Sequence, residues 1–349
     1  MILVNNPGAW TDVYGPLRHA TWNGCTAADL IFPFFLFTVG AAVTVSVGQR
    51  ARHGAGQHRL AWQILRRVAL IFALGLFLNG FPLFDWSNLR IPGVLQRVAL
   101  CYGLACFAVL ALPIRRQAVA FAVLLLGYAA VLRSGSFPAS PSDLAEPDAN
   151  LVAYLDRQLL GGHLLHPGWD PEGLLSTLGA TATTLLGAFA GHWLRSKNSP
   201  SRLAGGLLTG GTAAVLLGLV LDLWLPINKS LWTPSFALFT GGVALDAFAL
   251  CYWLIDCRGY RAWATPFLVY GTNAIMAYML SSLMAKTMLL WQVTEAGGSR
   301  VSLQQYLFEH FFLRVAQPIN ASLLYALTYV LLWLGIAGLL YRQRVLIKI

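Results

Sequence analysis

Long apolar runs separated by short polar segments dominate the pattern of this chain. A membrane-spanning helix needs about 20 mostly apolar residues to cross a hydrocarbon core of about 30 Å. No segment shows the ten-residue alternation of a barrel strand, so we predict an all-α polytopic membrane protein. The nine complete candidate spans are residues 30–47, 66–80, 93–112, 117–132, 174–194, 203–224, 233–255, 265–292 and 318–341.

The first residues have the composition of the end of one more span. Residues 1–4 are apolar, and Asn5, Asn6 and the Pro-Gly pair at 7–8 follow them as a helix stop and turn. An asparagine here could equally aim its amide at a carbonyl group. We expect about ten spans in the full form, the first truncated here, with both termini cytoplasmic and one transmembrane domain over residues 1–349.

Composition and charge agree with a membrane protein and orient it. The chain is 57% hydrophobic and 11% charged, against about 25% charged residues in soluble domains. Loops after alternate spans hold 15 of the 24 basic residues, and the positive-inside rule makes these loops cytoplasmic. The net charge of +10 is therefore a topology signal and not a nucleic-acid footprint. The 15 residues are Arg50, Arg52, Arg59, Arg66, Arg67, Arg115, Arg116, Arg195, Lys197, Arg202, Arg258, Arg261, Arg342, Arg344 and Lys348.

The same alternation places His19 and the acidic loop region 133–173 outside, the latter with a short helix at 150–160. Within it, Asp170 and Glu172 begin the span 174–194 as N-cap and first-turn acid. Acidic and aromatic side chains together suit a sugar, and they equally suit a solvated loop.

Polar groups in or close to the spans are the candidate functional residues, because a polar group in a membrane is energetically costly and is usually kept for function. His19 is a candidate general base at the outer rim. Asp29, three residues after Thr26, has the spacing of a capping box, which by itself explains both residues. Arg97 and Lys286 could each snorkel or bind an anionic or carbonyl-bearing ligand. The five cysteines have neither metal nor disulfide spacing, and we expect no metal.

These segments resemble the heparan-alpha-glucosaminide N-acetyltransferase family, in its bacterial, membrane-only form. The matching motifs span nearly the whole chain in family order. They are ILVNNPG (2–8), HATWNGCTAADLIFPFFLFTVG (19–40), IPGVLQRVAL (91–100), DPEGLLSTLGA (170–180), PINKSLWTPSFALFTGG (226–242) and YGTNAIMAYMLSSL (270–283).

The resemblance implies transfer of acetyl from cytoplasmic acetyl-CoA to the amine of a glucosamine-type sugar on the far side. It implies His19 as the general base and Asn5 as its partner, with Asn6 still possible. We also expect the protein to lie in a bacterial inner membrane, as a homodimer, with His19 on the periplasmic side. The expected roles are catalysis for His19, Asn5 and Asp29; acetyl-CoA binding for Arg97, Lys286 and Asn273; and acceptor binding for Asp170, Glu172, Trp22 and Asn23.

Two other functions stay open, namely an amino-sugar permease and a glycan O-acyltransferase. Within the first reading, His19 could act as base in a ternary complex or become acetylated in a ping-pong cycle. We favour the ternary complex.

Overall fold

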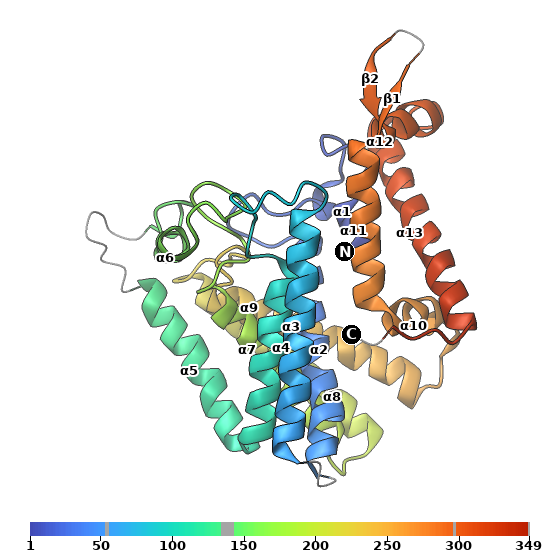
Figure 1. The fold of residues 1–349 in the computed structure, drawn as a ribbon. Coiled ribbons are helices and arrows are strands. Elements are labelled where there is room, and N and C mark those ends of the chain that lie inside the picture. Colours follow the sequence, from blue (N-terminus) through green and yellow to red (C-terminus); the bar gives the residue numbers. More distant parts are fainter. Residues whose placement is uncertain (53–55, 134–142, 296–297, 348–349) are drawn as a thin grey trace. The chain divides into compact units, whose positions relative to one another are not determined.

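The computed structural model describes residues 1–52, 56–133, 143–295 and 298–347, which are almost entirely helical (Figure 1). Lys348 and residues 134–142 of the acidic loop therefore lie outside the described residues. The chain divides into two compact units. The first comprises residues 1–19, 26–28 and 260–349, and the second comprises residues 20–25 and 29–259.

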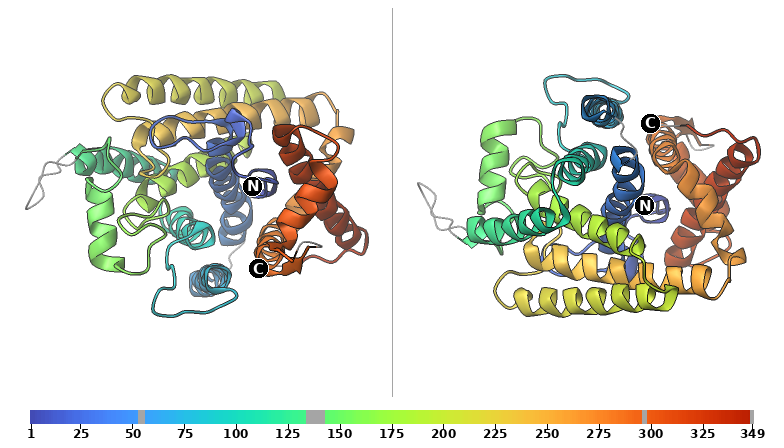
Figure 2. Two further views of the ribbon diagram at one scale, coloured as in Figure 1. Left: turned by 90° about the horizontal axis from the view of Figure 1, so that it is seen from above. Right: turned by 90° about the horizontal axis from the view of Figure 1, so that it is seen from below.

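The second unit is a bundle of helices. The described helices are α2 (Ala27–Arg52, which begins in the first unit), α3 (Gln57–Gly80), α4 (Val94–Ala111), α5 (Ile114–Arg133), α6 (Leu151–Leu160), α7 (Thr177–Leu194), α8 (Pro200–Asp222) and α9 (Pro234–Tyr252, continued by a π-helical turn Trp253–Cys257). The α3–α4 and α8–α9 pairs pack together, and α8 and α9 run side by side along one side of this unit (Figure 2). The short helix α6 confirms the prediction at 150–160, with the Asn150 side chain as its N-cap.

Helix α7 lies inside the second unit, in contact with α4, α5, α8 and α9. Glycines let its backbone approach α2 closely: a Cβ on Gly187 would overlap the Phe37 carbonyl, and a Cβ on Gly40 would overlap the Thr184 carbonyl. Twelve of its 18 residues are buried, and many are Gly, Ala or Thr. Small residues at such contacts are typical of helix packing inside membrane bundles.

The number of spans agrees with the sequence in part. In the described part of the chain, seven helices are long and apolar enough to cross a membrane, or eight if one bent pair counts as a span. The seven match seven of the predicted runs. The predicted span 174–194 exists as α7 but is not among them, because its threonines and glycines serve protein contacts instead of lipid.

The predicted helix 265–292 is broken, which corrects that prediction. It consists of α10 (Thr265–Thr272) and α11 (Ala274–Leu290), which meet at a 71° bend. Asn273 sits at the bend with a non-helical backbone. Its Nδ2 donates to Val345 O at 3.0 Å and its Oδ1 accepts from Ile347 N at 2.9 Å, so the side chain replaces helix bonds with contacts to the C-terminal segment.

The rest of the first unit packs around a long C-terminal helix. Its elements are α1 (Ile2–Asn5), two single 3₁₀ turns (Gly15–Leu17 and Ala262–Ala264), α12 (Leu303–Leu307, continued by a π-helical turn Phe308–Phe312) and α13 (Pro318–Arg342). A hairpin that the sequence did not predict, β1 (Gln292–Thr294) with β2 (Arg300–Ser302), pairs antiparallel with Val293 opposite Val301.

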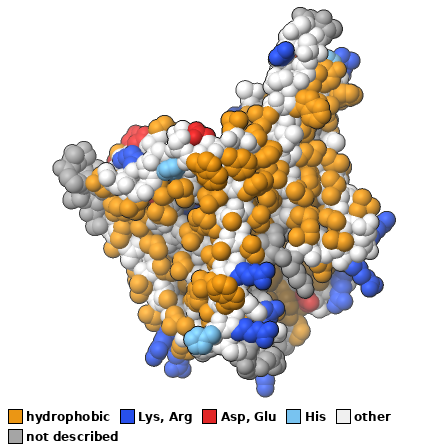
Figure 3. Space-filling model, in the orientation of Figure 1, with side chains coloured by type: hydrophobic (Ala, Val, Ile, Leu, Met, Phe, Trp, Pro, Cys, Tyr) orange, Lys and Arg blue, Asp and Glu red, His pale blue; other side chains and the backbone are white. Residues whose placement is uncertain are grey.

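Apolar side chains cover the helix flanks, and charge gathers at helix ends (Figure 3). On α5, for example, Val119, Val123 and Leu126 are each more than 60% exposed. Exposed apolar bands of this kind on several long helices are expected where lipid is the solvent. On the face shown, Asp and Glu side chains lie over the loops around α6, and Lys and Arg side chains gather at the opposite end of the second unit. The chain is an integral membrane protein.

Candidate active site

The loop that follows His19 is held by the loop that precedes α9. Asn23 and Asn228 form an antiparallel bridge, and Asn228 Nδ2 donates to Asn23 Oδ1 at 2.9 Å. Gly24 N donates to Ile227 O at 2.7 Å, from a backbone with φ of +103°, which favours glycine. Two of the sequence motifs, 19–40 and 226–242, therefore meet at these loops. Asn23 holds the loop through its hydrogen bond with Asn228, and the residue remains exposed.

Asp29 fixes the residue directly after His19. The Asp29 carboxylate is fully buried, accepts from Ala20 N at 3.0 Å and lies 3.2 Å from Lys229 Nζ. The Thr26 hydroxyl donates to Arg18 O at 2.6 Å. Asp29 thus anchors the loop from inside, and its predicted catalytic role stays a prediction.

Cys25 is a thiol beside this ion pair. Burial and the negative charge of Asp29 raise the pKa of Cys25 to about 12, against the opposing charge of Lys229. Because nucleophilic attack by cysteine needs the thiolate, Cys25 is poorly suited to accept an acyl group.

Aromatic rings gather around Trp22. Its ring meets Trp169 edge to face with centroids 5.1 Å apart, and His166 stacks on Trp169 at 4.4 Å. Trp22 Nε1 donates to Leu144 O at 2.9 Å, which fixes the ring against the acidic loop. His166 is exposed, while both tryptophans are half-buried. The arrangement presents partly exposed rings next to the loop of His19.

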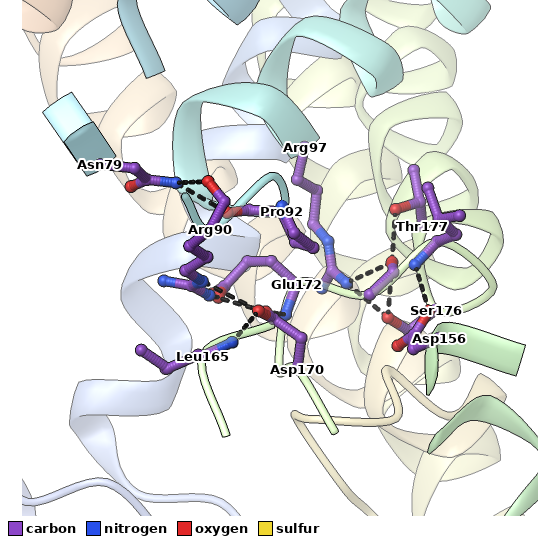
Figure 4. Close-up of polar contacts among 12 residues, drawn as sticks. Asn79, Arg90, Pro92, Arg97, Asp156, Leu165, Asp170, Glu172, Ser176 and Thr177 are labelled. Carbon is purple, nitrogen blue, oxygen red and sulfur yellow. Dashed lines mark hydrogen bonds and ion pairs between the residues drawn. The ribbon is translucent and has the colours of Figure 1, made fainter. Parts of the chain in front are cut away.

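Arg90 forms ion pairs with Asp170 and Glu172, the two acids predicted to bind the acceptor (Figure 4). Arg90 donates from Nε to Asp170 Oδ2 at 2.8 Å and from Nη2 to Asp170 Oδ1 at 2.6 Å and to Glu172 Oε2 at 2.5 Å. Asp170 also accepts from Leu165 N and Glu172 N and is 2% exposed. Burial opposes the charge of Arg90, but these two carboxylates hold the pKa of its guanidinium above the ordinary value. Asp170 is thus a structural acid whose oxygens are occupied, and Glu172 is the more open of the two.

Arg97 joins three motifs from within α4 (Figure 4). It is 1% exposed, donates from Nη2 to Gly173 O at 3.1 Å and to Ser176 Oγ, and lies 5.2 Å over the Trp232 ring. Among the described residues, its Nε and Nη1 have no hydrogen-bond partner. Arg97 is therefore a buried crosslink with two spare donors, and its predicted contact with acetyl-CoA stays a prediction.

Asp156 lies in the same region and was not singled out from the sequence. Its Oδ1 accepts from Leu174 N at 2.9 Å, and its buried Oδ2 has no partner among the described residues (Figure 4). Burial raises the pKa of Asp156 to about 6, with the Leu174 N–H acting in the opposite direction. This carboxyl group therefore titrates at a higher pH than an ordinary aspartate.

In the first unit, Asn5 and Asn6 differ in availability. Asn6 is buried and its Nδ2 donates to Ile2 O at 2.7 Å, whereas Asn5 is exposed. The segment after them is tied to α13, because Ser322 Oγ donates to Ala9 O and accepts from Ala9 N, both at 3.2 Å. Of the two asparagines, Asn5 is the one able to reach a ligand. His19, the last residue of the first segment of this unit, is also exposed.

The two remaining predicted ligands of acetyl-CoA lie in or beside α11. Lys286 is half-buried within the helix. The side-chain amide of Asn273 is hydrogen-bonded to the C-terminal segment at the bend described above. The geometry supports a structural role for Asn273 and leaves Lys286 as a candidate.

Several site residues were missed because each acts on a partner distant in sequence. Arg90 is 80 residues from Asp170, and Lys229 is 200 residues from Asp29. A signal was present in one case, since Lys229 is the one charged residue in the sequence of the motif 226–242.

Comparison with known proteins finds distant homology to a membrane N-acetyltransferase. The chain is 29% identical to the human heparan-alpha-glucosaminide N-acetyltransferase over a 244-residue alignment that covers 56% of this chain and 36% of the human protein. It is 27% identical to the mouse protein of the same name over 251 residues, with 56% and 37% covered. The alignment thus spans little more than a third of these curated relatives. No family model matches the chain.

Proposed function

We propose that this protein is a transmembrane N-acetyltransferase that moves acetyl from cytoplasmic acetyl-CoA to the amine of a glucosamine-type sugar on the opposite side. The single observation that carries the proposal is the distant homology to proteins named for this reaction. The local geometry supports it, since His19 is an exposed imidazole whose neighbour Ala20 is held by a buried acid at the start of a spanning helix.

His19 is proposed to act as the general base. A sugar amine is mostly protonated near neutral pH and must lose a proton before it attacks, and imidazole is the usual acceptor in this range. The nitrogen then bonds to the acetyl carbon and loses a second proton as the carbon–sulfur bond of the thioester breaks. One of the two protons passes to the departing CoA sulfur, and the other is released to solvent. In a ternary complex this transfer is direct, which the proposal favours over acetylation of His19.

Asn5 is proposed to stabilise the oxygen of the thioester carbonyl as negative charge develops on it. One such donor is worth about 10²–10³ in rate. Exposure of Asn5, in contrast to the engaged amide of Asn6, supports this choice between the two.

The acceptor is proposed to bind against the rings of Trp22, Trp169 and His166. Aromatic faces stack on the apolar face of a pyranose, and the half-buried, hydrogen-bonded Trp22 offers a fixed surface. Glu172 and Asn23 are proposed as polar contacts of the acceptor. Asp170 contributes indirectly through Arg90.

On the donor side, the proposal keeps Arg97 and Lys286 as candidate contacts of acetyl-CoA and the basic helix ends as the entry for its phosphates. The bacterial inner membrane, the outward side of His19 and the homodimer belong to the same proposal.

The deciding experiment incubates membranes that contain the protein with radiolabelled acetyl-CoA and glucosamine. The proposal expects labelled N-acetylglucosamine, formed in proportion to the amount of protein. An amino-sugar permease would move label-free sugar and make no such product. An O-acyltransferase would instead label a hydroxyl, which mild base hydrolyses while an amide survives. Parallel reactions with chitosan oligomers and muropeptides would identify the acceptor.

A further inference from the structure

The loop at residues 226–232 is hydrogen-bonded to the loop at residues 20–25 at two places and forms an ion pair with the buried Asp29. Gly24 N bonds to Ile227 O, and Asn228 bonds to Asn23. Lys229 then reaches Asp29, whose other oxygen accepts from Ala20 N. All these residues belong to the second unit, and Ala20 is bonded covalently to His19.

We infer that Lys229 is a positioning residue for the acetyl transfer proposed above: it acts through Asp29 to fix the backbone on which His19 stands. The inference rests on the proposed function for its catalytic meaning. Its structural content, the restraint of the loop 20–25 by Lys229, can be tested without turnover.

Charge explains why the third contact matters most. Asp29 is 0% exposed, and removing the cation beside a buried carboxylate is strongly unfavourable. The Lys229 side chain keeps 19% of its surface exposed, so it brings a partly hydrated charge to a fully buried partner. Loss of Lys229 would therefore drive Asp29 to reorient toward water or take up a proton. Either change weakens or removes its charge-assisted acceptance of the Ala20 N–H.

Geometry explains why the effect should fall on the rate. A general base must stand within hydrogen-bond reach of the proton that it takes. Ala20 N belongs to the peptide group that joins Ala20 to His19, so a loosened backbone at Ala20 displaces the imidazole. None of the residues proposed to contact acetyl-CoA is changed. A displacement of about 1 Å can cost about 10²-fold in rate.

The test measures steady-state kinetics with glucosamine and acetyl-CoA, together with hydrogen–deuterium exchange of residues 19–24, whose amides at Ala20 and Gly24 are bonded. Lys229→Met should lower kcat by about 10- to 100-fold while the KM for acetyl-CoA changes by less than about twofold. Exchange of residues 19–24 should become at least about tenfold faster, since a protecting contact is lost. Lys229→Arg, which keeps the positive charge, should leave kcat and the exchange rate of residues 19–24 near their wild-type values. Arg133→Met is the matched control, because Arg133 is exposed and, among the described residues, donates to the Trp224 carbonyl in the same unit.

A second variant keeps the test valid if Lys229→Met does not fold. Asp29→Asn combined with Lys229→Met leaves no buried charge unpaired and should fold, because replacing both partners is often neutral. Its residues 19–24 should still exchange faster than in the wild type, with lower kcat. Wild-type kinetics and exchange in this double variant, or unchanged exchange in Lys229→Met, would overturn the inference. A wild-type protein without acetyl transfer would refute the proposed function instead, and the exchange arms would still decide whether Lys229 holds the loop.

Discussion

At the scale of single residues, the segment around His19 divides into side chains that face outward and side chains that hold it in place. His19 and Asn23 are exposed, while Asp29 and Asn228 are fully buried. Buried polar groups that satisfy one another rigidify a loop, which is what a site on loops needs if its reacting group is to stand still.

Replacing His19 with alanine should lower acetyl transfer by about 10²–10⁴-fold, the usual contribution of a general base. Binding of acetyl-CoA, measured by isothermal titration, should be unchanged, because His19 is proposed to contact the acceptor amine. His58→Ala, at another exposed histidine, is the control and should keep wild-type turnover. Retention of more than a small fraction of turnover in the His19 variant would make this residue an ordinary loop histidine.

Asp156 gives a pH-dependent prediction. Its pKa is raised to about 6 by burial, from an ordinary value of 3.8, so the folded protein binds its proton more tightly than the unfolded chain does. The resulting stabilisation is complete below about pH 4 and is lost as pH rises through about 6. Its size is on the order of 1–3 kcal/mol.

Thermal unfolding in detergent checks this. The midpoint of the wild type should rise relative to that of Asp156→Asn as pH falls from 7 to 5. Asparagine keeps an oxygen for Leu174 N but does not titrate. Parallel midpoints for the two proteins across this range would contradict the raised pKa.

At the scale of elements, hydropathy predicts those helices whose flanks face lipid and fails where a segment faces protein. The runs that became α4, α5, α8 and α13 were predictable to within a few residues because lipid demands apolar length. Helix α7 instead packs its backbone closely against neighbouring helices, which requires small residues. These glycines, alanines and threonines lower its mean hydropathy. The break at Asn273 was invisible for a related reason: the groups that replace its helix bonds, Val345 O and Ile347 N, lie about 70 residues away.

Asn273→Ala should therefore release the C-terminal segment while the spanning helices stay folded. Both bonds of the amide are lost, at about 1 kcal/mol each. Hydrogen exchange of residues 343–347 should accelerate by roughly 30-fold, given a combined loss of about 2 kcal/mol. Asn273→Asp is the graded control, since its carboxylate can still accept from Ile347 N but cannot donate to Val345 O, and its exchange should fall between the two. Equal exchange in all three proteins would show that the bend is held by other contacts.

At the scale of the whole molecule, the site was predictable as a set of motifs but not as a set of contacts. The motif residues His19, Asp29 and Arg97 were all chosen as candidates from the sequence, because charged and amide groups beside apolar runs stand out. Which of them touch a substrate and which hold the protein together depends on long-range partners such as Arg90 and Lys229. In a chain with few polar groups, the same residue types serve substrate contact and structural support. The residue type alone therefore does not show which of these two roles a polar residue has.

The last prediction concerns which end of the helices faces the cytoplasm. Charge separates the two ends of the second unit, and the positive-inside rule assigns the basic end to the cytoplasm. Cysteine reporters at exposed residues test this: Ala149→Cys beside α6 and Arg59→Cys at the start of α3, in a background with Cys25, Cys251 and Cys257 replaced by serine. Ser142, in the same loop as Ala149, lies outside the described residues and is avoided. A membrane-impermeant maleimide should label Ala149→Cys in cells whose inner membrane is intact, and should label Arg59→Cys only after permeabilisation. The reverse pattern would place His19 on the same side as the acetyl-CoA pool, and a periplasmic acceptor would then have to be abandoned even if the transfer reaction itself were demonstrated.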